Sequence, residues 1–242
     1  MSTAGIIVIL LFAFAASFIQ RVTGFGYGIV FMTAAPFFMP SYGEATALSG
    51  MLAIICALGA GIQLFRYVPW KKLAVILPTF LLVSFFAVGI VAKVDSHLLK
   101  HILGGALIAV ALYFLCLKGR VRMRPSVTTQ LGMGTISGMM GGLFGMQGPP
   151  AVIYFISCSE RKEEYMALTQ WYFIIGNLAM TAYRAGNGFL TPTVGKASLM
   201  GVPAVLLGLL LGSKVYSRLP VSAIRQTVYI FIGAAGIIAL FS

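Results

Sequence analysis

The stretch Gly141-Gly142-Leu143-Phe144-Gly145-Met146-Gln147-Gly148-Pro149-Pro150 interrupts an apolar segment that runs from about residue 131 to 156. Its four glycines loosen a helix, and its two prolines remove amide donors and clash with the preceding turn. Within hydrocarbon, backbone groups freed in this way must be buried by protein or lie beside water. The stretch therefore predicts a broken membrane helix with a candidate binding site at the break.

A second break, Thr23-Gly24-Phe25-Gly26-Tyr27-Gly28, interrupts the first apolar segment of the chain. Its Phe25-Gly26 pair recurs as Phe144-Gly145, 119 residues later. Glu44 matches Glu163 at the same offset, and Leu77-Pro78 matches Val202-Pro203 at an offset of 125. Insertions in the joints account for the drift, so the chain is predicted to be an internal duplication.

The composition is that of a membrane protein. Of the 242 residues, 60% are hydrophobic and 9% are charged, whereas globular chains carry about 25% charged residues. The mean hydropathy is +0.98, and the apolar runs suit membrane spans of about 20 residues. The first run lacks a basic leader and continues into the break, which favours mature structure over a cleaved signal peptide.

The net charge of +12 does not indicate a nucleic-acid partner, because the basic residues lie in short joints between apolar runs. Cys56, Cys116 and Cys158 are isolated in apolar surroundings, so neither a disulfide framework nor a metal site is predicted. The sequence offers no convincing nucleophile or acid–base pair, so we expect no catalytic site, and we expect no cofactor.

The predicted fold is an all-α polytopic membrane protein made of two inverted repeats. Each repeat has one glycine-broken helical hairpin followed by three transmembrane helices, and the basic joint at mid-chain separates the two. The first repeat is residues 1–122, with a hairpin at 4–39 and spans at 45–65, 73–92 and 100–117; the second is residues 123–242, with a hairpin at 130–157 and spans at 165–183, 197–212 and 225–241.

The distribution of Lys and Arg decides the orientation of the repeats. If each broken segment crosses the membrane once, the joints at 66–72 and 159–164 lie on opposite faces, and the basic residues divide nine against seven. If each broken segment returns to the face it entered from, those joints share a face and the division is twelve against five. The positive-inside rule favours the second arrangement.

We therefore expect an inner-membrane protein with cytoplasmic basic joints, with both termini outside, and with the joint at 184–196 also outside. The charge count does not separate re-entrant hairpins from hairpins that cross the whole bilayer.

The two breaks are predicted to meet near the membrane midplane. In a hairpin, the helix after the break begins at the tip and directs its free amides and positive dipole end there, which suits a small anion. Arg21 would add a positive charge, and Thr23 and Gln147 would add neutral donors. The candidate substrate-binding residues are Arg21, Thr23, Gly24, Phe25, Gly26, Gly28, Phe144, Gly145, Gln147, Gly148, Gln170 and Asn177.

These residues also have structural interpretations. Arg21 could extend to the membrane interface, since a long basic side chain can keep its charge in water. The glycines could serve close helix packing alone, and Gln170 and Asn177 could form hydrogen bonds between helices. Glu44 and Glu163 begin the spans after the hairpins, where the helix dipole favours an acid, so a proton-coupling role is the weaker interpretation.

The doubled pattern, Thr-Gly-Phe-Gly-x-Gly at 23–28 and Gly-Leu-Phe-Gly-x-x-Gly at 142–148, resembles the TauE/SafE sulfite exporter family of membrane proteins. The resemblance covers essentially the whole chain, including the basic joint at mid-chain. It implies an exporter or permease for small sulfur oxyanions and organosulfonates.

The breaks and the resemblance together predict a secondary transporter that exports a small sulfur-containing oxyanion, such as sulfite or an organosulfonate, by alternating access around the two tips. An anion channel and a non-transporting membrane assembly subunit are the alternatives. The expected partners are the small anion and the lipid bilayer, with a homodimer as a further possibility.

Overall fold

The computed structural model describes residues 3–116, 125–216 and 237, and every regular element in these residues is a helix. The elements are α1 (Thr3–Thr23), α2 (Tyr27–Met32), α3 (Ala35–Phe38), α4 (Tyr42–Gly61), the 3₁₀ helices η1 (Ile62–Tyr67) and η2 (Trp70–Lys72), α5 (Ile76–Val91), α6 (Ser96–Cys116), α7 (Val127–Phe144), α8 (Gly148–Cys158), α9 (Lys162–Gly186) and α10 (Pro192–Tyr216). The predicted span at 225–241 lies, apart from residue 237, outside the described residues.

The all-helical class and the apolar helices agree with the predicted membrane protein. Four helical segments are long and apolar enough to cross a membrane: Thr3–Thr23, Tyr42–Tyr67, Ser96–Tyr113 and Pro192–Val215. Shorter apolar helices lie at Tyr27–Phe38, Ile76–Val91 and Gly148–Cys158. The division into inverted repeats stays a prediction.

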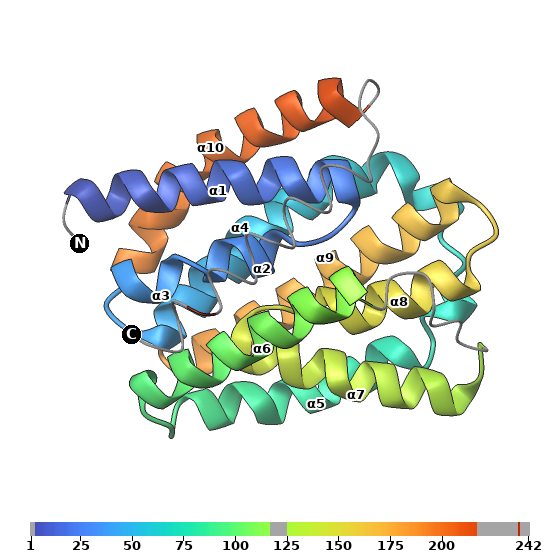
Figure 1. Ribbon diagram of the computed structural model, residues 1–242, viewed down its shortest axis with the longest axis horizontal. Helices are drawn as coiled ribbons and strands as arrows, with labels where there is room; N and C mark the ends of the chain where they lie inside the picture. The colour runs from blue at the N-terminus through green and yellow to red at the C-terminus, as the bar shows by residue number, and fades with distance from the viewer. Residues whose placement is uncertain (1–2, 117–124, 217–236, 238–242) are drawn as a thin grey trace.

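Both predicted breaks interrupt the helices. Figure 1 shows α2 turning back beside α1 and α8 turning back beside α7. The backbone is left-handed at Gly24 (φ 88°), Gly26 (φ 105°) and Gly145 (φ 67°), a region that glycine enters without steric cost. Pro149 and Pro150 fall in the first turn of α8, where a missing amide costs no intrahelical hydrogen bond.

Glycine stripes let two pairs of helices pack backbone to backbone. On α7, Gly134, Gly138 and Gly142 face α5; a methyl group at Gly134 would come within 2.8 Å of the Ile76 carbonyl oxygen. On α10, Gly208 and Gly212 face α1 in the same way. Small residues at this spacing are typical of membrane helix contacts. The glycines of these stripes therefore serve close helix packing, whereas the glycines of the tips allow the chain to turn.

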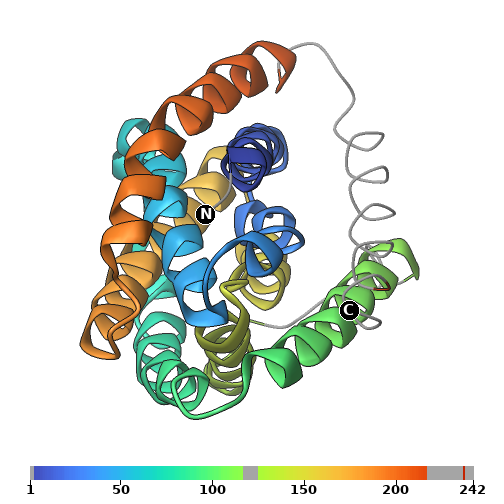
Figure 2. The same ribbon diagram turned by 90° about the vertical axis from the view of Figure 1, so that its left-hand side faces the viewer.

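The long helices α4 and α9 pack side by side at the centre and run in opposite directions. Gly43, near the start of α4, lies against the Phe189 ring beyond the end of α9, and Gly61 lies against Ile174. Seen end on, α6 and α10 occupy opposite sides of the bundle (Figure 2). The α4–α9 pair thus forms the part of the molecule against which both tips are placed.

Candidate functional site

The two breaks meet inside the bundle. Gly28, in the first turn of α2, lies so close to the Gly145 carbonyl oxygen that a methyl group at position 28 would overlap it. Both breaks, together with α1, α4 and α9, line one pocket. The lining residues are Gln20, Gly26, Tyr27, Gly28, Ile29, Ala53, Gly145, Met146, Gln147, Gly148, Phe173 and Asn177.

The pocket is small and uncharged. None of its lining residues carries a formal charge, so its polar character comes from amide side chains and backbone. The space open to the centre of a water molecule is about 20 Å³, which is room for about one water.

The first tip is held by hydrogen bonds from α1 and α9. The Thr23 hydroxyl lies 2.7 Å from the Phe25 carbonyl oxygen across the turn. Gln20 Oε1 accepts a hydrogen bond from the Tyr27 amide. Gln170 Nε2 donates to the Gly24 carbonyl oxygen over 2.8 Å, and Gln170 Oε1 accepts from Gln20 Nε2 over 3.3 Å. These bonds fix the shape of the first tip.

The second tip begins with a glycine-based helix end. The Gly145 amide donates to the Gly141 carbonyl oxygen, as in an αL cap, and the Met146 amide donates to the Met140 carbonyl oxygen. A side chain of α7 also holds the tip, because the Ser137 hydroxyl donates to the Gln147 carbonyl oxygen.

Two side chains complete the second tip. The Tyr172 hydroxyl donates to Ser137 Oγ over 2.8 Å, which links α9 to this tip. Gln147 Nε2 lies 3.4 Å from the Phe173 carbonyl oxygen, and Gln147 Oε1 is buried with no hydrogen-bond partner. An unpaired buried amide oxygen at the pocket indicates a place for a bound water or ligand group.

Half of the predicted binding residues line the pocket: Gly26, Gly28, Gly145, Gln147, Gly148 and Asn177. Of the others, Thr23, Gly24, Phe25 and Gln170 belong to the first tip or hold it, and Phe144 is the last residue of α7. Substrate binding by any of them stays a prediction.

Arg21 does not line the pocket. Its Nε donates to Ser213 Oγ on α10 over 2.7 Å, and its aliphatic stem lies against Gly212. The geometry therefore gives Arg21 a contact between α1 and α10, and the pocket lacks the fixed positive charge expected from this residue.

Sequence reasoning missed Gln20, which lines the pocket and binds both the first tip and Gln170. The signal was available, because Gln20 is a polar residue within an apolar segment, four residues before Gly24. The hydrophobic lining residues, such as Ile29, Ala53 and Phe173, carry no such signal.

Arg184 lies within α9 and not in the predicted outer joint at 184–196. The helix continues to Gly186, and the Arg184 side chain is only 1% exposed. Its Nη2 donates to the Gly141 carbonyl oxygen over 2.9 Å. The sequence predicts a joint at Arg184 because this is the first charge after an apolar run. The prediction was wrong because α9 continues beyond Arg184 and packs against α4 there.

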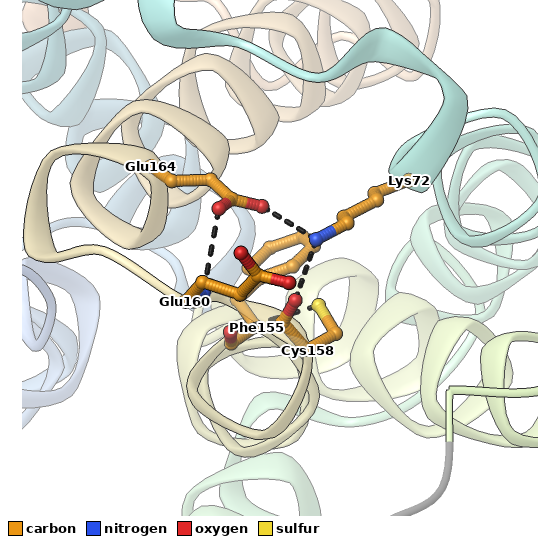
Figure 3. A network of polar contacts seen from close by, with 5 residues as sticks. All are labelled: Lys72, Phe155, Cys158, Glu160 and Glu164. Atoms are coloured by element: carbon orange, nitrogen blue, oxygen red, sulfur yellow. Dashed lines mark hydrogen bonds and ion pairs between the residues drawn. The ribbon is translucent and has the colours of Figure 1, made fainter.

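A polar network lies where α8 passes into α9 (Figure 3). Lys72 Nζ is 2.6 Å from Glu164 Oε1 and 2.6 Å from the Cys158 carbonyl oxygen, and the Glu160 amide lies 3.3 Å from Glu164 Oε2. The network joins the 66–72 joint to the 159–164 joint.

No group of His, Cys, Asp and Glu within residues 3–116 and 125–216 is suited to hold a metal ion. The polar groups of the pocket are backbone and amide groups beside apolar side chains, which suits reversible binding of a small molecule.

Comparisons with known proteins give the family. The profile of the sulfite exporter TauE/SafE family matches residues 9–239. A protein of Cupriavidus necator described as "Probable sulfite/organosulfonate exporter TauE" is 24% identical over 210 residues, which cover 83% of this chain and 80% of that protein. No solved structure matches the chain. The chain therefore belongs to the TauE/SafE sulfite exporter family, whose members are multi-pass membrane transporters and not enzymes.

Proposed function

We propose that this protein exports sulfite or a small organosulfonate through the pocket between the two glycine breaks. One observation carries the proposal: a single pocket is lined by both breaks, although they are 119 residues apart in the sequence. Membrane transporters bind their substrates where broken helices meet.

The chemistry of the pocket suits a small oxyanion. The helix α8 begins at Gly148, so its first amide points toward the tip and has no acceptor within the helix. The amide nitrogens of Gln147 and Asn177 both donate to the Phe173 carbonyl oxygen, and the second N–H group of each is the donor proposed for the anion. Neutral donors can bind an anion and still release it, because no fixed charge holds it there.

Two features support alternating access. The pocket has room for about one water, so binding of an oxyanion would require the tips to separate. The pairs α1–α10 and α5–α7 are formed by the same kind of glycine stripe, and each pair joins a helix of one proposed repeat to a helix of the other. Movement of one pair against the central α4–α9 pair would open one tip at a time.

The polar network favours the proposed orientation. Its contact between Lys72 and Glu164 brings the 66–72 and 159–164 joints to the same end of the bundle. Hairpins that return to the face they entered from require this, whereas eight single crossings would separate the two joints. We infer that this end, rich in Lys and Arg, faces the cytoplasm.

Flux in proteoliposomes tests the proposed function. Purified protein should exchange labelled sulfite or methanesulfonate, with saturation at high concentration, and should not exchange acetate at a comparable rate. Gly28→Ala should reduce exchange at least about tenfold, because its methyl group would push apart the two tips. Gly132→Ala, in α7 with open space around it, is the matched control and should exchange like the wild type.

Absence of sulfite and sulfonate flux in the wild type would reject the proposed substrate class. Flux that does not saturate would favour the anion channel, and equal flux for both glycine variants would remove the tips from the pathway.

A further inference from the structure

Arg184 is a buried arginine that the pocket does not use. It lies on the same side of α9 as Asn177, which lines the pocket, and it follows Asn177 by seven residues. Seven residues of α-helix rise about 10 Å, so the backbone of Arg184 is about two turns beyond Asn177, toward the end of α9 where Gly43 of α4 meets Phe189. The guanidinium reaches back toward the pocket, because a methyl group at Gly50 would lie within 3.8 Å of both Nη1 and Asn177 Oδ1.

Most of the hydrogen-bonding capacity of Arg184 is unused. Its Nη2 donates to the Gly141 carbonyl oxygen, whereas Nε and Nη1 are buried without a hydrogen-bond partner. Within the described part of the chain, the ion pairs are Lys72–Glu164 and Arg161–Glu163, so no carboxylate pairs with Arg184. A buried guanidinium with two unpaired donors lacks the negative charge that would normally accompany it.

The backbone of α4 lies close to those donors. Gly50 of α4 faces Arg184; a methyl group there would lie 3.0 Å from Nη1, 3.2 Å from Thr181 Oγ1 and 3.8 Å from Asn177 Oδ1. Thr181 Oγ1 is also buried without a partner. Glycine at position 50 therefore lets the α4 backbone approach a row of polar atoms on α9 that runs from Asn177 past Thr181 to Arg184.

We propose that Arg184 is a second anion-binding position, through which an oxyanion passes between the pocket and the outer end of α9. The proposal rests on the proposed function, because the anion is the transported one. Nε and Nη1 point to opposite edges of the guanidinium, and from either one an oxygen of a sulfonate, sulfite or carboxylate group can accept a charge-assisted hydrogen bond. Pairing there also supplies the charge that the buried guanidinium lacks.

Thermal unfolding of the purified full-length protein, with and without sodium methanesulfonate at constant ionic strength, tests this position. The wild type should gain melting temperature as the anion is added. Arg184→Gln should lose at least half of that gain, and without the anion it should melt no lower than the wild type, because an uncompensated buried charge is gone. Arg184→Lys keeps the charge but not the donors at Nε and Nη1, so its gain should be intermediate.

Two further variants sharpen the test. Gly50→Ala should reduce the anion-dependent gain, because its methyl group narrows the space in front of Nη1. Arg66→Gln removes one positive charge from an exposed position and should keep the full gain.

If Arg184 only supports the Gly141 carbonyl, Arg184→Gln will melt at a lower temperature and keep the full anion-dependent gain, and this result would overturn the proposal. A wild type that shows no gain would overturn it as well. The proposed function fails on a different measurement, namely the absence of sulfite and sulfonate flux in proteoliposomes.

Discussion

At the scale of single residues, the second tip depends on one hydroxyl group. Ser137 Oγ accepts from the Tyr172 hydroxyl and donates to the Gln147 carbonyl oxygen, and all three residues are buried. Ser137→Ala would leave both partners unpaired, at a cost of about 1–3 kcal/mol. We expect Ser137→Ala to lower both the melting temperature and the sulfite flux.

A double-mutant cycle isolates that link. Tyr172→Phe removes one partner, so the double variant Ser137→Ala/Tyr172→Phe should lose less stability than the sum of the single variants, with a coupling of about 0.5–3 kcal/mol. Additive losses, measured by thermal unfolding, would show that the hydroxyl pair does not act as a unit.

At the scale of helices, the glycine stripe of α7 sets how closely α5 and α7 approach. A methyl group at Gly138 would lie 2.8 Å from Val83 Cβ and 3.0 Å from the Phe80 carbonyl oxygen. Gly138→Ala should therefore cost about 1–3 kcal/mol through overpacking.

Gly132→Ala, on the same helix but with open space around it, supplies the comparison for that variant. It should be neutral or stabilising by up to about 1 kcal/mol, because alanine favours a helix more than glycine does. Equal melting temperatures for the two variants would contradict the close contact.

The sequence predicted the helix breaks well because glycine and proline act locally. The breaks at Gly24–Gly26 and Gly145–Gln147 follow from the backbone preferences of a few residues. The direction of a side chain depends on the partner helix. Arg21 bonds to α10, and Arg184 is buried by α4, and neither contact can be deduced from spacing along the chain.

The same distinction applies to the pocket. Its glycines and Gln147 could be found from the tips, whereas Ala53 and Phe173 belong to α4 and α9 and join the pocket only through tertiary packing.

At the scale of the whole molecule, the two ends of the bundle have different compositions. One end has the Lys72–Glu164 network, and the other has the contact between Gly43 and Phe189, close to the buried Arg184. An anion leaving the pocket toward the second end would meet Arg184, which is the direction that export requires if the basic end is cytoplasmic. The orientation in the membrane therefore links the proposed site to the direction of transport.

Cysteine labelling in intact cells tests that orientation. In a background in which Cys56, Cys116 and Cys158 are replaced, single cysteines are introduced by Lys71→Cys, Glu160→Cys and Asn187→Cys, all at exposed positions. A membrane-impermeant maleimide should label position 187 in intact cells, and positions 71 and 160 only after the membrane is opened. The maleimide reacts with the thiolate of a water-exposed cysteine and does not react with a cysteine covered by lipid. Labelling of positions 71 and 160 from opposite faces would contradict this orientation and favour eight single crossings. Labelling of positions 71 and 160 in intact cells, with position 187 labelled only after the membrane is opened, would place Arg184 at the cytoplasmic end and make it an entrance instead of an exit.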